Sequence, residues 1–554
     1  MPSSTFSASE THWDYVVVGG GLAGTVLAHR LNKLDATSKI LVIEAGPNAN
    51  DREDIVWPNS TNLEGGEFDW RDTTAPQPHL DNRVLPFPQG KALGGGTVIN
   101  NSGWIRGDKF DYDLWGAAVN DTRWSYDGLL PYMKKSEAFW SKTINKDQHG
   151  LCGANSIQSV ISTNREFPLR QQLLDSWAEL GINAVPDLDG NAGHPLGVAD
   201  VQENRVQGRR QIASNTHPLD KVTVLVNTTV AKIVLETVDG SLTATGVELD
   251  SGIKIKSRQV VLSAGAIRSP QILLLSGIGP KEHLDELGIS VALDQPQVGK
   301  NLAEHSLIPL AFRVRDPSAG YIIGPSNPLF ANEQYGWGTP TDFLVSADVP
   351  KEGLRGAIAE DEGSVPDASH PLLAHPRTFL EHVLLYVGAP DGTLATLVTF
   401  VLLTTSRGDV KLRSTDVKTP PVINPNYLST AVDRYVAREG VRRNIKLGGS
   451  DSTLLGREVF DGEVGAPGFS TTLTPESTDA EIDARVRASL ATGYHPMGSL
   501  SMGKVVDSDL KVIGVNNLRV VDASVFPVVI TGHLQVATYA LAEQAAEIIH
   551  GKKK

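Results

Sequence analysis

The chain has little cysteine, no long hydrophobic segment and no concentrated basic region, and each absence excludes a class of protein. Cys152 is the single cysteine among 554 residues, so no intramolecular disulfide forms and the fold does not depend on an oxidising compartment. The most apolar stretch, at 393–403, is too short to span a bilayer. A net charge of −14 argues against nucleic acid or an anionic membrane as a partner. The one basic run, at 552–554, is expected to be a solvated end.

The N-terminal segment MPSSTFSASETHW is polar and lacks the apolar region of a secretory signal. Together with the single cysteine, this predicts an intracellular, cytoplasmic protein. With 40% hydrophobic and 21% charged residues, the composition is that of a globular protein, and the length is sufficient for two or more domains.

Motifs for metal binding or nucleophilic catalysis are also missing. The 14 histidines form no metal-like cluster, there is no G-x-S-x-G elbow, and no catalytic signature surrounds the cysteine. We therefore predict that there is no metal site. Chemistry is expected to fall to a bound cofactor, with the protein supplying orientation and proton transfer.

A glycine-rich turn between two apolar segments is the strongest functional signal. Residues 15–18 form a short apolar run that predicts a buried parallel strand, and GGGLAG follows at 19–24. A helix-compatible segment continues to about Lys33, and a second apolar strand at 40–43 ends on Glu44. This βαβ pattern carries the dinucleotide-binding fingerprint in the context that the fingerprint requires.

Each glycine of the fingerprint has a distinct expected role. Gly19 permits the tight turn, Gly21 lets the backbone approach a pyrophosphate, and Gly24 lets helix and strand pack closely. The pyrophosphate is expected at the helix N-terminus, where free N–H groups and the helix dipole favour an anion. Glu44 follows Gly24 by 20 residues, where a carboxylate can hold a ribose hydroxyl.

Further segments fit the same nucleotide-binding fold. The β-branched run at 222–234, the strand-like TGVELD and the apolar QVVLSAGA at 259–266 are typical of strands. The last of these runs into a helix, as expected in a parallel sheet. Residues 169–180 have a helical pattern, and the alanine-rich ATYALAEQAAEIIHG predicts a helix that ends at Gly551.

Two other segments bring polar groups into apolar surroundings. The glycines at 94–96 suggest backbone laid against a ligand, with Asn100, Asn101 and Ser102 close behind, although a surface glycine loop is the alternative. Asp522 lies within the β-rich run NNLRVVDASVFP at 516–527, where a carboxylate needs a partner. A helix N-cap or a buried salt bridge would satisfy it as well as a cofactor would.

Five segments then make the chain recognisable: GKALGGGTVINNSGWIRGDKFDYD at 90–113, GAIRSPQILLLSGIGP at 265–280, VGKNLAEH at 298–305, SRGDVKLRSTDVKTPPVINPNYLS at 406–429 and GYHPMGSLSMGKVVDSDLKVIGVNNLRVVDASVFP at 493–527. In this order they resemble the signatures of the glucose–methanol–choline (GMC) family of flavoprotein oxidoreductases. The resemblance covers nearly the whole chain, and about 310–400 is the least recognisable part.

The resemblance implies an α/β fold, α+β overall. A doubly wound parallel-sheet FAD-binding domain is expected together with a substrate domain built on an antiparallel sheet plus helices. Residues 12–308 would be the N-terminal FAD-binding region, with substrate-domain insertions around 150–220. Residues 309–490 would be mainly substrate domain, and 491–554 would return to the FAD domain with the catalytic residues.

The resemblance also implies FAD and a set of contacts to it. Val230 would lie on a strand whose backbone meets the adenine, and Asp522 and Ala523 would lie beside the ribityl and pyrophosphate groups. Ile99 stands where covalently flavinylated members carry a histidine, so the FAD is expected to be non-covalent. The expected cofactor-binding residues are Gly19, Gly21, Leu22, Ala23, Gly24, Glu44, Ala45, Trp70, Gly96, Thr97, Asn100, Asn101, Ser102, Gly103, Val230, Asp522, Ala523 and Leu534.

Two histidines are distinguished by their context. His495 lies in Gly-Tyr-His-Pro before the Asp522 run, and His533 lies in Ile-Thr-Gly-His-Leu after it. Spacing alone leaves open whether they are a functional pair or two structural histidines. In the family, the corresponding positions are a histidine and then a histidine or asparagine facing flavin N5, which implies that His495 and His533 are catalytic. The His–His form is similar to fungal aryl-alcohol-oxidising and glucose-oxidising members, whereas choline-oxidising members carry asparagine second.

One departure from the family pattern follows the first histidine. The usual Thr-Cys-Arg is Ser499-Leu500-Ser501 here, so any role of that arginine is absent.

The sequence thus predicts FAD-dependent oxidation of a primary, aromatic or allylic alcohol to an aldehyde or ketone, in secondary metabolism. His495 is expected to take the hydroxyl proton while the hydride goes to flavin N5, and oxygen or another acceptor takes the electrons. Tyr494, beside the catalytic position, suggests a semi-aromatic substrate site. The alternatives are a non-redox enzyme on the same fold, such as a hydroxynitrile lyase or cyclising synthase, and a cofactor-binding protein without catalysis.

Overall fold

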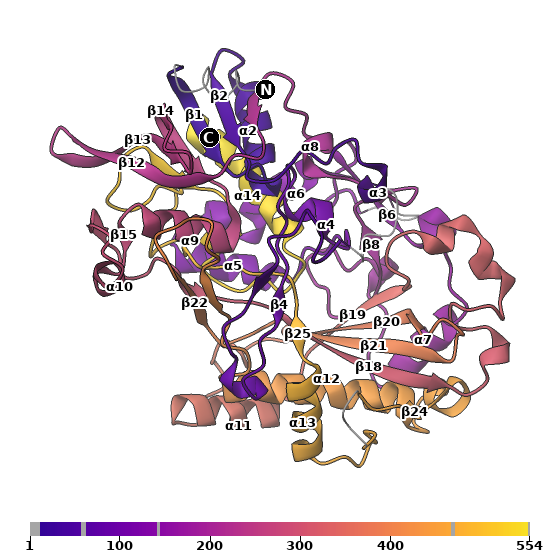
Figure 1. The fold of residues 1–554 in the computed structure, drawn as a ribbon. Coiled ribbons are helices and arrows are strands. Elements are labelled where there is room, and N and C mark those ends of the chain that lie inside the picture. Colours follow the sequence, from indigo (N-terminus) through magenta and orange to yellow (C-terminus); the bar gives the residue numbers. More distant parts are fainter. Residues whose placement is uncertain (1–10, 57–62, 141–144, 467–470, 552–554) are drawn as a thin grey trace.

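The computed structural model describes residues 11–56, 63–140, 145–466 and 471–551. Within these residues, two seven-stranded sheets form the framework, and helices pack around both (Figure 1). The basic run at 552–554, predicted to be a solvated end, lies outside the described residues.

The first sheet is built on the glycine-rich βαβ unit and has the order β11-β2-β1-β14-β13-β12, with β26 beside β14. Strands β11, β2, β1, β14 and β26 run parallel to one another. Strands β13 and β12 extend the sheet beyond β14 as an antiparallel hairpin. The strands predicted at 15–18 and 40–43 are therefore confirmed. The strand predicted within 259–266 is also present, but it begins earlier, at Lys254, and ends at Leu262, before helix α9 (Gly265–Leu275) begins. Their bounds are β1 Trp13–Val18, β2 Ile40–Ile43, β11 Thr223–Leu225, β12 Val230–Val238, β13 Ser241–Leu249, β14 Lys254–Leu262 and β26 Leu518–Val520.

Burial on both faces explains the unbroken apolar runs of this sheet. Val16 pairs with Leu41 on one side and Val260 on the other, and all three are fully buried. Helix α2 (Leu22–Leu34) follows β1 and packs against α14 (Gln535–His550), so two helices far apart in the sequence lie side by side (Figure 1). As predicted, α14 ends at Gly551, which adopts a left-handed conformation.

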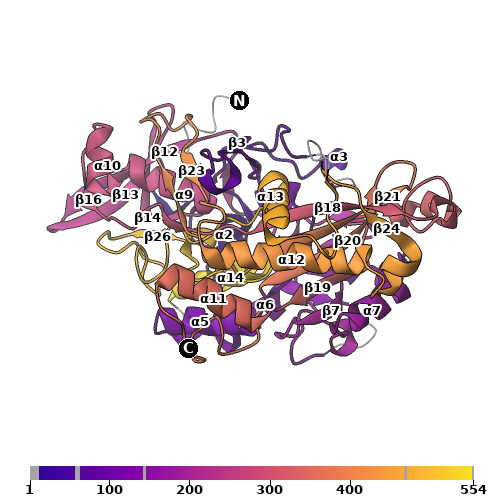
Figure 2. The same cartoon turned by 90° about the horizontal axis from the view of Figure 1, so that it is seen from below.

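The second sheet is antiparallel, in the order β24-β18-β21-β20-β19-β7, with β25 beside β18. Helix α12 (Ala431–Gly449) lies across it, next to α11 (Lys351–Glu362), as Figure 2 shows. The antiparallel sheet with helices that the resemblance implied is confirmed. Its strands are β7 Gly197–Asp200, β18 Ser306–Val314, β19 Phe343–Ala347, β20 Leu380–Gly388, β21 Leu394–Val401, β24 Phe460–Glu463 and β25 Ala491–Thr492.

The apolar run at 393–403 forms β21 inside this sheet. Among the described residues, no helix combines the length and apolar character that a membrane span requires. Helix α7 (Arg170–Glu179) confirms the helix predicted at 169–180.

Two strand predictions were wrong in detail. At 516–527 the strand stops at Val520, and Asp522 instead begins a short 3-10 helix by accepting the Ser524 N–H at 2.9 Å. Aspartate favours such turns because its side chain bonds the backbone two residues on. The run at 222–234 is broken between β11 and β12, where Asn227 adopts a φ of 50°.

Short elements complete the chain. The other helices are α3 Glu53–Val56, α4 Gly96–Ile99, α5 Lys109–Ala118, α6 Tyr126–Ser136, α8 Ala213–Thr216, α9 Gly265–Leu275, α10 Lys281–Glu286 and α13 Asp479–Ser489. The other strands are β3 Asp72–Thr73, β4 Pro86–Phe87, β5 Glu137–Phe139, β6 Asn155–Ser159, β8 Gln202–Glu203, β9 Arg205–Val206, β10 Arg209–Arg210, β15 Ile278–Gly279, β16 Leu293–Asp294, β17 Lys300–Leu302, β22 Gly408–Lys411 and β23 Val422–Asn424.

Candidate active site

A cavity of about 890 Å³ is lined by residues from both sheets. All the residues predicted to bind the cofactor or to be catalytic line it, with the exception of Gly24. A Cβ atom on Gly24 would lie 2.0 Å from the Gly19 carbonyl oxygen, so Gly24 serves the close helix–strand packing expected of it. The cavity therefore brings together segments from Gly19 to Leu534.

One wall of the cavity is a cradle of backbone. Gly19 has a φ of +97°, and a Cβ there would lie 2.5 Å from the Ser263 carbonyl oxygen. Gly95, from the second glycine cluster, packs so closely on Gly21 that a Cβ would lie 2.7 Å from its Cα. The N-terminus of α2 begins at this point with no side-chain cap and no acidic residue in its first turn. Unpaired N–H groups at a helix N-terminus suit a pyrophosphate.

Glu44 lies at the end of β2, beside the cradle. Its two carboxyl oxygens accept the N–H groups of Gly20 and Gly46, each at 2.8 Å, and burial raises the pKa of the carboxyl to about 7. Each oxygen keeps a further acceptor site, so the ribose contact expected from the sequence is compatible with these bonds. Glu44 thus also holds the glycine turn in shape.

Asp522 also lies on the cavity wall. Its carboxyl is buried and accepts hydrogen bonds from Ser269 Oγ at 2.6 Å and the Gly265 N–H at 3.0 Å, in addition to Ser524. Burial raises its pKa. Of the alternatives left open by the sequence, the N-cap is observed, and Asp522 still lines the cavity.

Several buried polar atoms on the cavity wall have no hydrogen-bond partner within the protein. Within the described part of the chain, seven lining residues each have at least one buried polar side-chain atom without a hydrogen-bond partner: Ser102, Gln202, Ser263, Arg268, Gln271, Glu381 and Gln535. Buried polar groups are nearly always satisfied in native proteins. A polar dinucleotide therefore fits both the glycine cradle and the orphaned atoms.

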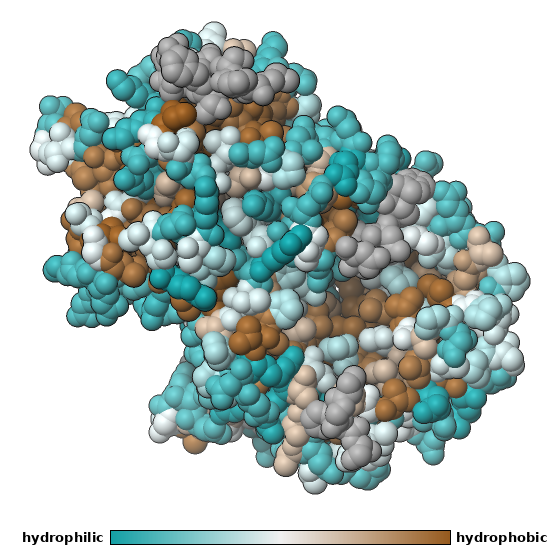
Figure 3. Space-filling view, viewed as in Figure 1, coloured by the Kyte–Doolittle hydropathy of each residue, from teal (hydrophilic) through white to brown (hydrophobic). Residues whose placement is uncertain are grey.

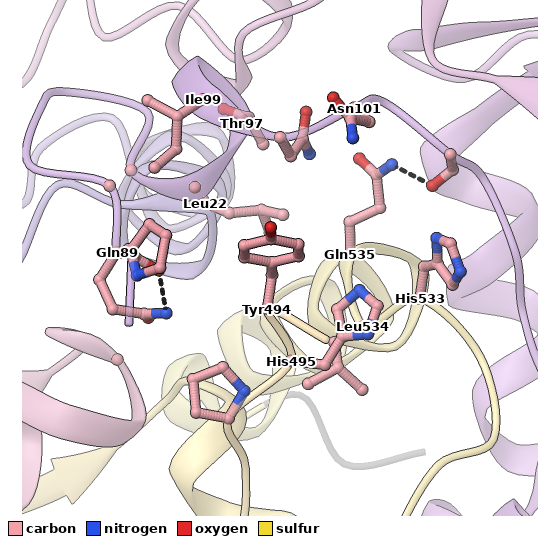
Figure 4. A pocket seen from close by; sticks show the side chains of 18 of the residues that line it. Leu22, Gln89, Thr97, Ile99, Asn101, Tyr494, His495, His533, Leu534 and Gln535 are labelled. Carbon is pink, nitrogen blue, oxygen red and sulfur yellow. Dashed lines mark hydrogen bonds between the residues drawn. The ribbon is translucent and has the colours of Figure 1, made fainter. Parts of the chain in front are cut away.

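His495 and His533 face each other across the other end of the cavity. Their ring centroids are 4.8 Å apart and the rings are tilted by 44°. Figure 4 shows both imidazoles directed toward the space that Tyr494 and Gln535 also border. His495 follows β25, and His533 precedes α14, so the two sheets together create the pair.

The backbone beside His495 is strained. Tyr494 has a φ of 66°, which a bulky side chain rarely adopts. The N–H of His495 donates to Glu304 Oε1 at 2.7 Å, and the N–H of Tyr494 donates to Thr492 Oγ1 at 3.2 Å. These bonds hold a conformation that is typical of functional sites.

A third histidine, His305, lies within hydrogen-bond distance of His495. The Nδ1 atoms of His305 and His495 are 3.0 Å apart. Burial lowers the pKa of His495 well below 6.5, and the charges of His533 and His305 add to this effect. Burial also lowers the pKa of His305, to about 3. Both rings are therefore neutral at pH 7, which leaves His495 able to accept a proton.

A carboxylate supports His533. Glu381, at the start of β20, is buried, and its Oε1 lies 3.0 Å from His533 Nε2. On the other side of the ring, a Cβ on Gly103 would lie 2.9 Å from His533 Nδ1. Gln535, two residues after His533 and the first residue of α14, donates through Nε2 to the Gly103 carbonyl (Figure 4). The position of His533 is thus fixed from both sides.

Comparison with known proteins agrees with this geometry. The family model described as GMC oxidoreductase matches residues 13–307 in its N-terminal part and 404–542 in its C-terminal part. The chain belongs to the GMC oxidoreductase family. GMC-type oxidoreductase acuG of Aspergillus aculeatus is 36% identical over 97% of this chain and 99% of its own.

Solved structures of other GMC oxidoreductases share the fold. Pyridoxine 4-oxidase from Mesorbium loti matches with a TM-score of 0.80 and 27% identity over 98% of this chain and 100% of its own. A fungal aryl-alcohol oxidase matches with a TM-score of 0.78 and 25% identity over 97% and 99%. The GMC chain described here is accordingly an FAD-dependent oxidoreductase of CH–OH groups that oxidises alcohols or sugars. It uses a small-molecule substrate and an electron acceptor.

Sequence reasoning missed three residues of this GMC site. His305 and Glu304 lie in VGKNLAEH, which was recognised without a role for either residue. Glu381 lies in the least recognisable part of the chain, within LEHVLLYVG. A carboxylate in so apolar a strand needs a partner, the argument that singled out Asp522, and it would also have singled out Glu381.

Proposed function

We propose that this GMC oxidoreductase oxidises a primary aromatic or allylic alcohol to the aldehyde, with His495 as the proton acceptor. The observation that carries the proposal is the pair of facing imidazoles, one held by His305 and the other by Glu381. Tyr494 beside them would contribute the aromatic character of the site. The name of the fungal aryl-alcohol oxidase also favours an aromatic substrate.

The residues proposed to hold FAD are those predicted from the sequence. The glycines of the cradle and the N-terminus of α2 would take the pyrophosphate, and Glu44 would take the ribose. Val230 would meet the adenine, and Asp522 and Ala523 the ribityl chain. Bound FAD supplies the acceptor for the hydride that leaves the alcohol carbon. Ile99, which lines the cavity, offers no atom for a covalent link.

His533 and His495 would have different roles toward the substrate hydroxyl. His533, held in place by Glu381, would form a hydrogen bond with the substrate oxygen. His495 would receive the hydroxyl proton, because its lowered pKa keeps the ring neutral. A positioned base of this kind typically contributes about 10²–10⁴-fold. The intracellular location and the role in secondary metabolism stay predictions from the sequence.

Anaerobic mixing of the holoenzyme with a panel of alcohols tests this proposal. Bleaching of the flavin absorbance by benzylic or allylic primary alcohols, with formation of the aldehyde, is the expected result. Substrate turnover without any bleaching would instead identify a non-redox enzyme on the GMC fold. A clear preference for glucose or choline would contradict the proposed substrate.

A further inference from the structure

One face of the second sheet forms a floor of the cavity beside the histidines. Alternate residues of neighbouring strands point into the cavity, as the period of two in a strand requires. They are Leu307 and Pro309 of β18, Thr396, Val398 and Phe400 of β21, and Glu381, Val383, Leu385 and Val387 of β20. We call Leu307, Pro309, Val383, Leu385, Val398 and Phe400 the apolar floor.

The strand register orders these side chains into rows. The first row contains Phe400 with Leu307 and Glu381 on either side, and Glu381 bonds His533. The second row contains Val398 with Pro309 and Val383. In the third row Leu385 lies opposite Thr396. A strand rises about 3.3 Å per residue, so Leu385 lies about 13 Å from the Glu381 row.

Several other polar side chains that line the cavity already have protein partners. Tyr335 donates its hydroxyl to the Glu166 carbonyl at 2.9 Å, and Thr396 donates to the Val387 carbonyl at 2.8 Å. The Glu203 carboxyl accepts the Thr339 N–H at 2.7 Å and pairs with Arg165. A sugar placed along the apolar floor would bury hydroxyls without partners, which is costly.

The cavity-lining polar atoms that lack protein partners all lie on residues outside the apolar floor. In the described residues these include Glu381 Oε2, beside His533, and Gln535 Oε1. The cavity therefore has one polar, reactive end and a long apolar arm. Figure 3 shows a hollow over the second sheet with hydrophobic side chains around it. The arm reaches the surface at Val387, which is 38% exposed.

We propose that the substrate is an alcohol whose reacting carbon carries an extended apolar chain, which lies along the apolar floor for about 13 Å. The inference rests on the proposed alcohol oxidation and specifies its substrate class. The hydroxyl would meet His495 and His533, and successive carbons would pass the Phe400, Val398 and Leu385 rows. The hydroxyls of a sugar have no counterpart among the six residues of the apolar floor.

A chain-length series tests the floor directly. Straight-chain 2-alken-1-ols of increasing length are mixed anaerobically with the holoenzyme, and kcat/KM for flavin reduction is measured. Burial of each methylene is expected to raise kcat/KM by about two- to fourfold until the chain passes Leu385. A flat series, or a higher kcat/KM for glucose or choline than for the long alkenols, would overturn the proposal.

A pair of matched variants locates the effect. Val398→Thr places a hydroxyl on the floor at nearly constant shape, and Val345→Thr makes the same change at a buried valine of β19 that does not line the cavity. The ratio of kcat/KM for the ten-carbon over the four-carbon alkenol should fall about tenfold in Val398→Thr. It should stay at the wild-type value in Val345→Thr, and equal ratios in both variants would overturn the proposal.

Binding of unreactive ligands separates this proposal from the proposed reaction. Butanamide and decanamide are titrated into the oxidised wild-type holoenzyme, and Kd is read from the change in visible flavin absorbance. Decanamide should bind at least about a hundredfold more tightly. Equal Kd values would overturn the apolar floor even if alcohols bleach the flavin. Failure of every alcohol to bleach it, with the Kd difference intact, would instead remove only the proposed reaction.

Discussion

His305 and His495 face each other through their Nδ1 atoms, 3.0 Å apart. A hydrogen bond between two imidazole nitrogens needs one donor and one acceptor, so the pair couples the tautomer of His495 to that of His305. Burial keeps His305 neutral, with a pKa of about 3. When His305 accepts through Nδ1, the proton of His495 resides on Nδ1 and its Nε2 is free to receive the hydroxyl proton.

Removal of this acceptor should slow the chemistry without loss of the cofactor. We expect His305→Leu to lower the anaerobic flavin-reduction rate by about one to two decades, because His495 loses its orientation. His305→Asn should recover part of the rate, since its amide oxygen can accept the same hydrogen bond. Stopped-flow absorbance with FAD content as control checks this, and identical rates in both variants would contradict it.

The partner of His533 gives a second expectation. His533→Asn should reduce flavin faster than His533→Ala, because the amide retains a hydrogen-bond donor for the substrate oxygen. Glu381→Gln should lower the flavin-reduction rate of the wild-type enzyme but should lower that of His533→Asn little further. The reason is that Glu381 acts through its 3.0 Å contact with His533 Nε2, which His533→Asn removes. Additive losses in this double-mutant cycle would show that the two residues act separately.

The pH dependence follows from the lowered pKa of His495. The ring accepts a proton only when neutral, so the reaction requires a pH above its pKa. Burial places that pKa well below 6.5. The flavin-reduction rate with saturating alcohol should therefore stay level as the pH falls from 8 to about 6.5 and drop only at lower pH. An acid limb centred above pH 7 would contradict the assignment of His495 as a buried neutral base.

Cofactor attachment is tested by precipitation. Because Ile99 lines the cavity where a linking histidine would be needed, acid precipitation should leave intact FAD in the supernatant. The absorbance spectrum and mass of the released flavin measure this. Flavin that remains with the precipitated protein would show a covalent link through another residue.

Local patterns in the sequence were sufficient to predict the βαβ unit that borders the cavity. The βαβ unit around Gly19, Gly21 and Gly24 is contiguous, so turn, helix and strand could be read from neighbouring residues. The histidines at 495 and 533 were identified by family resemblance, and the structure brings them within 4.8 Å between ring centroids. Asp522 was misplaced on a strand because its capping bond is invisible in an apolar run.

The cavity floor and the contact between His305 and His495 could not be predicted, because both arise from pairing between segments that are distant in the sequence. Phe400 lies beside both Leu307 and Glu381 through strand register, which no local pattern records. His305 reaches His495 across 190 residues of sequence. The alternation of cavity-facing residues in β20 and β21 is weak in the sequence, because the opposite face of each strand is also apolar and buried.

The central claim is that the histidine pair performs the proton chemistry of alcohol oxidation. The anaerobic flavin-reduction rate of His495→Ala and His533→Ala, each loaded with FAD, tests it most directly. We expect His495→Ala to lose about two to four decades while FAD stays bound, and His533→Ala to lose less. Rates near wild type in both variants would show that neither histidine carries out this chemistry.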